Sequence, residues 1–554
     1  MSTFNELIDF TRSTTGTYLD SVVYGPELVV NGTFDTDFTG WTDVSTGTGS
    51  IAVVSGQAQL TRVNINNRGF ISQGITVVAG ATYKVQITEV SGQAYVGVGT
   101  TDIGTTFLAQ PLATGENTFY ITPNATSVYI NVRGIVDGVQ LIDNVSVKEI
   151  IGGQVSGTPL LRTAAINEPR LEYDASGNPL GLLIEDGRTN VLAYSEGYTT
   201  GWDDINISST ANAIASPDGA VSGAKLQEDS SGTGGPRVYP NDAAVLTANQ
   251  AQTISCFFKA GTSSYAYLTI RHTNQNIAGA EFDLATGTVN STRDNGNMTL
   301  NGSGITSVGN GWYRCSVTAT CSVSTSSGLY FLGISDGTGI LNGGYPLYTL
   351  TGKNIYAWGA QVESGAFPTS YIPTSGSTVT RAKDLASLPV ERFAYNQPQG
   401  TVVAFQETFG TAGNLVPWEI HTANTNRIVY NAKSSTATII TGGSVQASLN
   451  HADQLPSVFY KQGLAFKKDD IASSLDASTL TDTSGTIPTV SSFKIGTDYS
   501  LLAMLNGHIK SIQYYPKRLS NEELELLTQP SASPTMNLTF DGQATSTLVE
   551  GLHD

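Results

Sequence analysis

The chain has 554 residues, including 59 Gly, 24 Tyr and 19 Phe, and only 13% of its residues are charged. This length is too great for one hydrophobic core, and the composition favours many short strands joined by turns over helices. The formal net charge of −18 argues against a nucleic-acid-binding surface, because that affinity rests largely on Lys and Arg neutralising phosphates.

The cysteines and the start of the chain bear on where the protein is assembled. Cys256, Cys315 and Cys321 are too few, and odd in number, to form a disulfide framework, which suits a reducing compartment where thiols act as small buried hydrophobes. The opening MSTFNELIDFTRSTTGTY contains Asp and Glu and no apolar run, so we expect no signal peptide. No run of about 18 apolar residues occurs, so we expect no membrane insertion.

Alternating apolar and polar residues begin shortly after residue 23. GSIAVVSGQAQLTRV, ATYKVQITEV and SVYINVRGI place apolar residues at or near every second position, with Gly, Asn, Asp and Thr turns between them. Strands at this spacing, with no helical stretch between them, predict an antiparallel β-sandwich over 24–152.

The same pattern then recurs. TFDTDFTGW ends at Trp41 and YSEGYTTGW ends at Trp202, and each copy closes on a similar strand, LIDNVSVKEI and IYAWGAQVESG. The repeat predicts a second sandwich of related design over 191–374. Because Trp41 and Trp202 occupy equivalent positions directly after a glycine, we expect both to fill the cores and not to serve as sugar platforms.

Alternation resumes near residue 397. IKSIQYYP predicts a strand, and RLSNEELELL predicts a short helix with a capping box formed by Ser520 and Glu523. The chain is therefore predicted to be all-β, with tandem antiparallel sandwiches and very little helix. The predicted parts are an N-terminal anchoring segment (1–23), a first sandwich (24–152), a connector (153–190), a second sandwich (191–374), a linker (375–396), a third sandwich (397–529) and a tail (530–554).

Two local resemblances refine the sandwiches. NGTFDTDFTGW through LIDNVSV resembles jelly-roll carbohydrate-binding modules, which open on an N-G-x-F…G-W strand and close on a D-N-V-x-V strand. LNGHIKSIQYYPKRLSNEELELL resembles the end of laminin-G-like, concanavalin-A-type domains. The resemblances imply two jelly rolls and a C-terminal laminin-G-like sandwich.

A third resemblance spans most of the chain. Four stretches resemble, in this order, a set of motifs found together in bacteriophage virion proteins, mostly tail- or fibre-associated: FTRSTTGTYLDS (10–21), EPRLEYD (168–174), GLLIEDGRTNVLAYSE (181–196) and WGAQVESGAFPTSYIPTSGSTVTRAKD (358–384). In such proteins the first motif runs on closely to the second, whereas here a whole sandwich separates Ser21 from Glu168. We therefore interpret 24–152 as a domain inserted into a linker, where loop closure costs little.

One stretch imitates a calcium loop. Asp35-x-Asp37-x-Thr39 begins like an EF-hand calcium loop. Position twelve of such a loop needs a bidentate carboxylate but is Thr46 here, and no helices are predicted beside the stretch, so we reject an EF-hand. The jelly-roll resemblance implies instead one structural calcium held by Thr33 or Asp35 together with Asp143. An ordinary acidic turn is the alternative, and we expect no other cofactor.

Catalytic patterns are weak. GISDG at 333–337 matches G-x-S-x-G, but a glycine-rich turn follows it where a nucleophile elbow needs a helix. The five His have no zinc spacing, and the adjacent carboxylates Glu185 and Asp186 would point to opposite faces of a strand. We therefore expect no enzymatic activity. Aromatic residues expected in loops are better candidates for binding carbohydrate: Tyr239, Tyr345 and Trp418.

Together these features favour a structural protein of a phage virion, a tail fibre or tail-associated part, that displays lectin-like modules for host attachment. It would be assembled in the host cytoplasm and exposed on the extracellular particle. The resemblance implies other virion proteins as partners and a homotrimer, with host-surface glycans as ligands and neither nucleic acid nor membrane. The alternatives are a head fibre or capsid decoration protein, a tail-borne polysaccharide depolymerase, and a secreted adhesin or the binding part of a glycoside hydrolase.

Overall fold

A computed structural model describes residues 8–20, 23–81, 83–151, 160–242, 244–272, 276–341, 343–410, 414–530, 537–540 and 544–547. Within these ranges the chain forms strands, one 3-10 turn and one α-helix, so the all-β prediction is confirmed. No helix of the described part is long and apolar enough to cross a membrane. Internal contacts divide the chain into two units, Met1–Ser21 with Thr158–Leu548 (unit 1) and Val22–Gly157 with Val549–Asp554 (unit 2).

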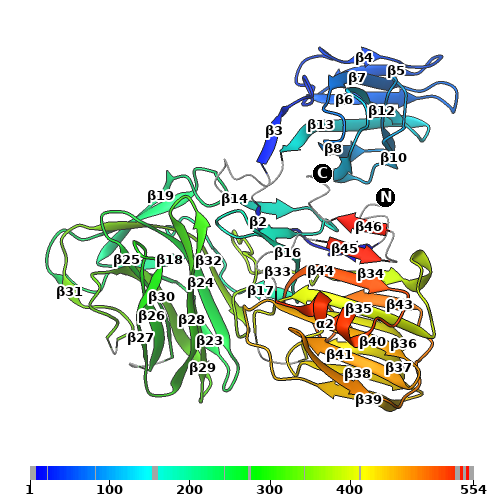
Figure 1. Cartoon of the computed structure of the whole chain (residues 1–554). Helices are drawn as coiled ribbons and strands as arrows, with labels where there is room; N and C mark the ends of the chain where they lie inside the picture. The colour runs from blue at the N-terminus through cyan, green and yellow to red at the C-terminus, as the bar shows by residue number, and fades with distance from the viewer. Residues whose placement is uncertain are drawn as a thin grey trace. The chain divides into compact units, whose positions relative to one another are not determined.

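Unit 2 contains the first sandwich (Figure 1, blue to cyan). Its strands are β3 (Val23–Glu27), β4 (Thr42–Asp43), β5 (Ser50–Val54), β6 (Gln57–Arg62), β7 (Phe70–Thr76), β8 (Tyr83–Ser91), β9 (Ala94–Gly99), β10 (Leu108–Pro111), β11 (Gly115–Ile121), β12 (Ser127–Gly134) and β13 (Gly138–Ile151). One sheet has the order β10-β9-β12-β7-β4, and the other has the order β11-β8-β13-β6-β5 with β3 beside β13. The alternating residues of the two sheets face each other and form the core.

The second sandwich lies in unit 1 (Figure 1, green). Its strands are β18 (Trp202–Ile205), β19 (Ile207–Ile214), β20 (Gly223–Glu228), β21 (Thr233–Gly234), β22 (Arg237–Pro240), β23 (Ala244–Leu246), β24 (Gln252–Ala260), β25 (Tyr265–Arg271), β26 (Ile277–Asp283), β27 (Thr288–Asp294), β28 (Met298–Gly309), β29 (Trp312–Cys321), β30 (Thr325–Ser335), β31 (Tyr348–Thr349) and β32 (Asn354–Ser364). The sheet orders are β18-β22-β30-β25-β26-β27 and β19-β20-β32-β24-β29-β28.

The two sandwiches share one plan. Strands β4, β7, β12, β9 and β10 correspond in order to β18, β22, β30, β25 and β26, and the second sheets correspond in the same way. The second sandwich adds β27 and β28, one to each sheet. It therefore repeats the plan of the first with one further strand at the edge of each sheet, as the sequence repeat predicts for a sandwich of related design.

Both predicted core tryptophans are buried, with 8% of Trp41 and 7% of Trp202 exposed. The indole N–H of Trp41 donates to the carbonyl of Asn31 (3.1 Å), and that of Trp202 donates to the carbonyl of Tyr194 (3.0 Å). Each ring packs on a positive-φ aromatic residue, Phe34 or Tyr198. The prediction that both residues fill the cores is confirmed.

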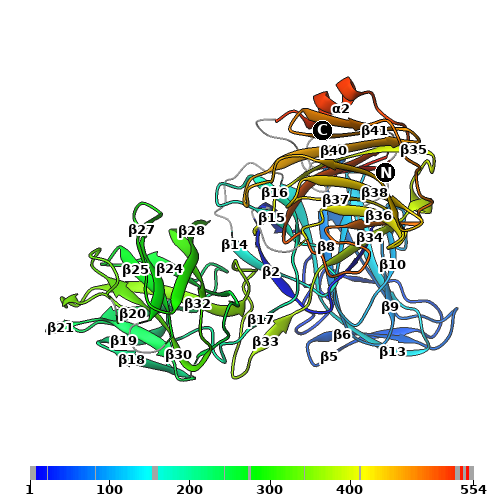
Figure 2. The ribbon, with the colours of Figure 1, turned by 90° about the horizontal axis from the view of Figure 1, so that it is seen from below.

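The C-terminal sandwich completes unit 1 (Figure 2). The strands from its own part of the chain are β34 (Leu385–Pro389), β35 (Gln399–Gln406), β36 (Trp418–Ala423), β37 (Asn426–Asn431), β38 (Thr436–Thr441), β39 (Ser444–Asn450), β40 (Tyr460–Lys467), β41 (Asp470–Leu475), β42 (Ser478–Asp482), β43 (Ser492–Ile495) and β44 (Gly507–Tyr515), with the 3-10 turn η1 (Val390–Arg392) after β34. Helix α2 (Asn521–Thr528) has the predicted capping box and rests Leu524 against Val403 and Ala465 on the outer face of one sheet.

Distant segments complete both sheets of this sandwich. Strand β1 (Asp9–Thr11) lies beside β34 in one sheet, while β15 (Leu171–Tyr173) and β16 (Pro179–Ile184) extend the other beyond β44. The buried side chains of Phe10 and Ile184 belong to the same core as those of Trp418 and Ile420. Residues 8–20 of the predicted anchoring segment are therefore part of the fold of unit 1. The predicted bounds 397–529 are too narrow for this sandwich, which also takes strands from the connector and the linker.

Two strand pairs connect these segments. Strand β2 (Gly16–Asp20) pairs with β14 (Leu160–Ala164), and β17 (Arg188–Asn190) pairs with β33 (Val379–Arg381). In the tail, β45 (Asn537–Phe540) pairs in parallel with β44, and β46 (Ala544–Thr547) pairs with β45. The remaining tail residues and residues 1–7 lie outside the described part.

The three cysteines are free and buried. Burial raises the pKa of the Cys256 thiol to about 12, so it stays protonated at neutral pH. The prediction that these residues act as small hydrophobes is confirmed.

Isolated fragments of the chain test which segments each sandwich needs in order to fold. We expect residues 23–151 to fold alone with a cooperative urea transition, because this fragment contains both sheets and the core of its sandwich. Residues 397–529 alone should show no cooperative transition, because β1, β15, β16 and β34 are missing and their partner strands are left unpaired. Urea unfolding followed by circular dichroism measures both, and a cooperative transition of 397–529 alone would contradict the assignment.

Candidate functional site

The four motifs of the virion-like set meet in one buried cluster of charges. Arg12 comes from the first motif, Arg170 from the second, Glu185 from the third, and Arg381 and Asp384 from the fourth. All five side chains are at most 1% exposed. Residues spread over more than 370 positions of the sequence therefore form one site, which we call the buried charge cluster.

Two carboxylates hold the three guanidinium groups. Nη1 of Arg12 lies 3.0 Å from Oδ1 of Asp384, and Arg170 pairs with the other oxygen of Asp384. Nη1 of Arg170 lies 2.8 Å from Oε2 of Glu185, which is also 3.3 Å from Nη2 of Arg381. Arg170 is the central member, because it alone of the three arginines pairs with Glu185 and Asp384 at 2.8 Å or less.

Hydrogen bonds to backbone groups add to these ion pairs. Arg12 donates to the carbonyls of Thr14 and Ala165 (both 2.8 Å). The backbone N–H of Glu185 donates to Asp384 (2.9 Å), and that of Ser370 donates to Glu185 (2.8 Å). The cluster therefore joins β1–β2, the connector, the end of the second sandwich and the start of β34.

Glu185 stays ionised within the cluster. Burial disfavours the ionised form of Glu185, but Arg381 and Arg170 outweigh it and hold the pKa of this carboxyl well below its usual range. A group that stays ionised and fully enclosed by arginines has neither a proton to exchange nor access to a substrate. The cluster is a structural element and not a catalytic site.

A second charged contact fastens the connector to the C-terminal sandwich. Nδ1 of His508 lies 2.7 Å from Glu407, and Nε2 lies 2.7 Å from Glu172 of the second motif. Burial works against the imidazolium, but hydrogen bonds to Glu172 and Glu407 outweigh it and raise the pKa of His508 to about 9. His508 is buried (2% exposed), because β16 pairs beside it and Glu172 of β15 contacts its ring.

Replacing the central arginine tests the buried charge cluster. We expect Arg170→Met to lower the free energy of unfolding of unit 1 by about 3–5 kcal/mol, because Glu185 and Asp384 would lose their shared partner while remaining buried. The matched control is Arg162→Met, which removes an exposed arginine from β14 and should change stability by less than about 0.5 kcal/mol. Urea denaturation measures both, and equal effects of the two variants would contradict the role of Arg170.

The His508 contact predicts a pH dependence. Because the pKa of His508 is raised in the folded state, its contribution is fully present below the unfolded value near 6.5 and is lost as pH rises through about 9. We expect wild type to lose about 3 kcal/mol of stability relative to His508→Gln between pH 6.5 and 9. Urea denaturation across this range measures the difference, and parallel pH profiles of the two proteins would refute it.

The structure brings together two of the three predicted carbohydrate-binding residues. Tyr239 on β22 and Tyr345, in the loop before β31, pack edge-on against the buried ring of Phe331 at 5.7 and 6.2 Å between ring centres. The guanidinium of Arg237 lies 3.9 Å from the ring centre of Tyr345. Both tyrosines are half-buried, so they present ring surface and hydroxyls on the outer face of the β22–β30–β25 sheet. We call this group the aromatic face.

Trp418 does not belong to it. This residue begins β36, is fully buried, and stacks on Phe493 with ring centres 6.1 Å apart. Trp418 alternates with Ile420 along β36, so both side chains face the same core. The prediction that Trp418 binds carbohydrate is therefore wrong.

The first sandwich has a related group on the corresponding sheet. Arg133 on β12 lies 4.4 Å from the ring centre of Tyr95 on β9 and 5.6 Å from that of Phe70 on β7. These are the strands that correspond to β30, β25 and β22. An arginine beside aromatic rings thus occurs on equivalent faces of both sandwiches.

The predicted calcium residues are only partly connected. The hydroxyl of Thr33 donates to Asp35 (3.0 Å), whereas Asp143 accepts from the backbone N–H of Asn144 (2.7 Å). Within the described residues, no group of three or more His, Cys, Asp or Glu side chains has a geometry that fits a metal ion. The Thr33–Asp35 contact is equally compatible with an ordinary acidic turn.

The most perturbed carboxyl outside the buried charge cluster is Glu419 on β36. Burial raises its pKa to about 7, although Arg427 lies 3.5 Å away. Its neighbour His421 stays neutral, because burial lowers its pKa to about 4. Glu419 is 0% exposed and covered by the segment around Tyr499, which donates its backbone N–H to it (3.3 Å). A substrate therefore has no path to this carboxyl in the structure.

Comparisons with known proteins add little. No protein-family model and no curated protein matches the chain. Solved structures with partial likeness include the tandem CBM22-1–CBM22-2 domain of Paenibacillus barcinonensis Xyn10C (11% identity, TM-score 0.19, covering 62% of this chain and 98% of that one). Domains LG4-5 of the mouse laminin alpha1 chain (11%, TM-score 0.18, 50% and 86%) and Trypanosoma rangeli sialidase (12%, TM-score 0.21, 89% and 86%) are also similar in part. With TM-scores this low, no functional property is taken from these proteins.

Proposed function

We propose that the chain is a non-enzymatic structural protein of a bacteriophage particle, a tail fibre or tail-associated part, that displays β-sandwiches for adhesion to host-surface glycans. The observation that carries the adhesive role is the aromatic face of the second sandwich. Half-buried tyrosines of this kind offer flat apolar surface together with a polar tip, which suits the C–H faces and hydroxyls of sugar rings.

The composition of the aromatic face supports recognition over a purely structural role. Tyr239 and Tyr345 lie outside the main core of the sandwich and pack on Phe331 instead. Arg237 and Arg271 lie 5.3 and 5.6 Å from the ring centre of Phe331 and add hydrogen-bond donors at its border. Aromatic residues with arginine are the types enriched at binding hot spots.

The position of unit 2 supports modular display. Its chain enters and leaves through adjacent strands, because Val23 pairs with Ile151. In unit 1 the flanking strands β2 and β14 also pair, Asp20 opposite Leu160. A module whose two ends are neighbours fits into a loop without disturbing the strands on either side. The resemblance of the surrounding motifs to virion proteins makes the particle the proposed location, with other virion proteins as partners and a homotrimer as the assembly.

Purified phage particles test the location. We expect the protein in their mass spectrum, in copy numbers that are multiples of three, and gold-labelled antibodies against unit 2 to decorate the tail. Decoration of the head alone would favour the head-fibre alternative. Absence from the particles would refute the virion role.

Aromatic-face variants test adhesion. We expect the full chain to bind host-surface glycans on an array, and Tyr239→Ala and Tyr345→Ala each to weaken binding about tenfold, because each removes one face of the stacking surface. The matched control is Tyr356→Ala, which removes a half-buried tyrosine from β32 on the opposite sheet.

Three outcomes would contradict this proposal. Unchanged binding by both face variants would remove the aromatic face as the site, and absence of binding to any host glycan would remove adhesion. Release of reducing ends from host polysaccharide by the purified protein would show a depolymerase instead.

A further inference from the structure

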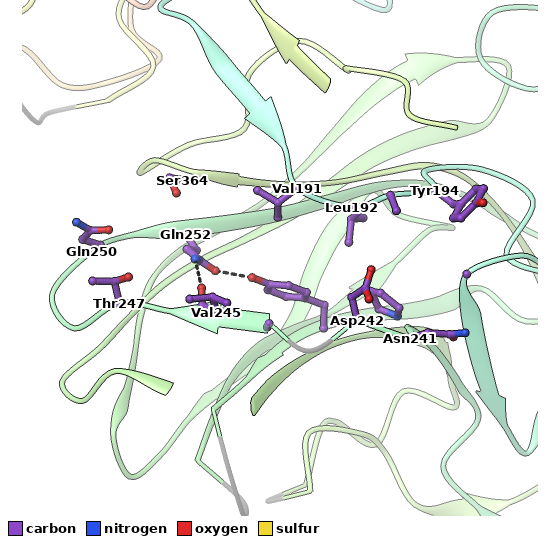
Figure 3. A pocket seen from close by; sticks show the side chains of 15 residues that line it. Val191, Leu192, Tyr194, Asn241, Asp242, Val245, Thr247, Gln250, Gln252 and Ser364 are labelled. Carbon is purple, nitrogen blue, oxygen red and sulfur yellow. Dashed lines mark hydrogen bonds between the residues drawn. The ribbon is translucent and has the colours of Figure 1, made fainter. Parts of the chain in front are cut away.

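The second sandwich contains a separate pocket of about 510 Å³ (Figure 3). It lies where the segment before β18 meets β23, the start of β24 and the end of β32. This volume is within the range of about 300–1,000 Å³ typical of small-molecule sites. We call it the end pocket.

The end pocket has an apolar floor. Leu192, Ala244 and Tyr330 form it, each at most 4% exposed. Tyr330 is held in place because its hydroxyl donates to Gln252 (2.5 Å), whose amide donates to the carbonyl of Val245 (2.8 Å), as the dashed lines of Figure 3 show. The floor is therefore apolar and preorganised.

Three polar side chains surround this floor. Asn241, Asp242 and Gln250 line the end pocket and are exposed. The backbone N–H of Asn241 donates to the carbonyl of Gly201 and that of Gln250 to the carbonyl of Thr247, but among the described residues no hydrogen bond engages the side chains of these three. The rim thus offers two amides and one carboxylate to a ligand.

Charge restricts which ligand fits. Of the described residues that line the end pocket, Asp242 alone is charged at neutral pH, and no Lys or Arg takes part. The whole chain carries a net charge of −18. Acidic ligands are therefore repelled, both locally and over a distance.

The end pocket is distinct from the aromatic face. Tyr330 and Phe331 are neighbours on β30 and point to opposite sides of the sheet, Tyr330 toward the core and the end pocket, Phe331 toward the aromatic face. The two sites also differ in charge, since arginines border the aromatic face and a carboxylate borders the end pocket.

We propose that the end pocket binds a neutral sugar unit. The C–H face of a pyranose ring lies on the floor of Leu192, Ala244 and Tyr330. Its hydroxyls reach the rim, where Asp242 accepts two of them and Asn241 and Gln250 both donate and accept. This site is separate from the aromatic face. The proposal rests on the proposed adhesive function only in taking sugars as the ligands.

Methyl NMR of the full chain, labelled at Ile, Leu and Val, tests this assignment. The probes are glucose, galactose, N-acetylglucosamine and rhamnose, with N-acetylneuraminic acid as the acidic counterpart. We expect the methyl signals of Val191, Leu192 and Val245 to shift with at least one neutral probe and not with the acidic one. Asp242→Ala and Gln250→Ala should each raise the Kd at least about tenfold, while Asp229→Ala, the same charge change in an exposed loop of this sandwich, should leave it unchanged. Unshifted methyl signals elsewhere in each variant show that it is folded.

The outcomes separate this proposal from the adhesive function. If glycans bind on the array but shift only Ile277 and Ile340 beside the aromatic face, the end pocket is overturned and adhesion stands. Stronger binding of N-acetylneuraminic acid than of the neutral probes at Val191, Leu192 and Val245 also overturns it, as does unchanged affinity of Asp242→Ala and Gln250→Ala. If no probe shifts any signal and the array is blank, both proposals fall.

Discussion

The ion pairs of Arg170 with Asp384 and Glu185 are the contacts on which unit 1 depends. Burying ionised groups is expensive unless each is paired and hydrogen-bonded, and here every carboxylate in the cluster meets arginines and backbone N–H groups. Such a cluster adds little net stability over an apolar core, but the loss of any member removes ion pairs that join different segments of the chain. It therefore favours one arrangement of the four segments over all others.

This constraint explains how the chain accommodates an inserted module. The strands that flank unit 2 are β2 and β14. Arg12 and Arg170 hold these two strands together, so their pairing does not depend on the residues between them. Arg12 donates to the carbonyl of Ala165, and Arg170 donates to that of Thr17 (3.1 Å). With both ends fixed in this way, a sandwich of about 130 residues can be added without disturbing the core of unit 1.

Much of the fold follows from short-range patterns in the sequence. Alternation predicts the sandwiches, the repeated aromatic-Gly-Trp endings predict two equivalent cores, and Ser520 with Glu523 predicts the start of α2. Each of these signals lies within about ten residues. The contribution of β1, β15 and β16 to the C-terminal sandwich could not be predicted, because each has only three to six residues. Strands β1 and β16 pair with strands more than 300 positions away, and β15 joins the sheet only through β16. Their motifs were visible, but the contacts between those motifs were not.

The candidate sites, like the fold, could be predicted from the sequence only in part. Tyr239 and Tyr345 could be proposed as exposed aromatic residues, but only the fold brings them onto Phe331. Trp418 had the same local signal and is buried, because a single residue next to a proline does not show whether it faces the core. The end pocket could not be predicted from the sequence, since the residues that line it come from five separate segments of the chain.

The most direct test of this account is a double-mutant cycle between Arg12 and Asp384, which lie 372 positions apart in the sequence and 3.0 Å apart in the structure. The free energy of unfolding of unit 1 is measured for wild type, Arg12→Met, Asp384→Asn and the double variant. The account predicts a coupling energy of about 2–3 kcal/mol between the two positions. Additivity within about 0.5 kcal/mol would contradict it, because the first and fourth motifs would then not meet in one cluster.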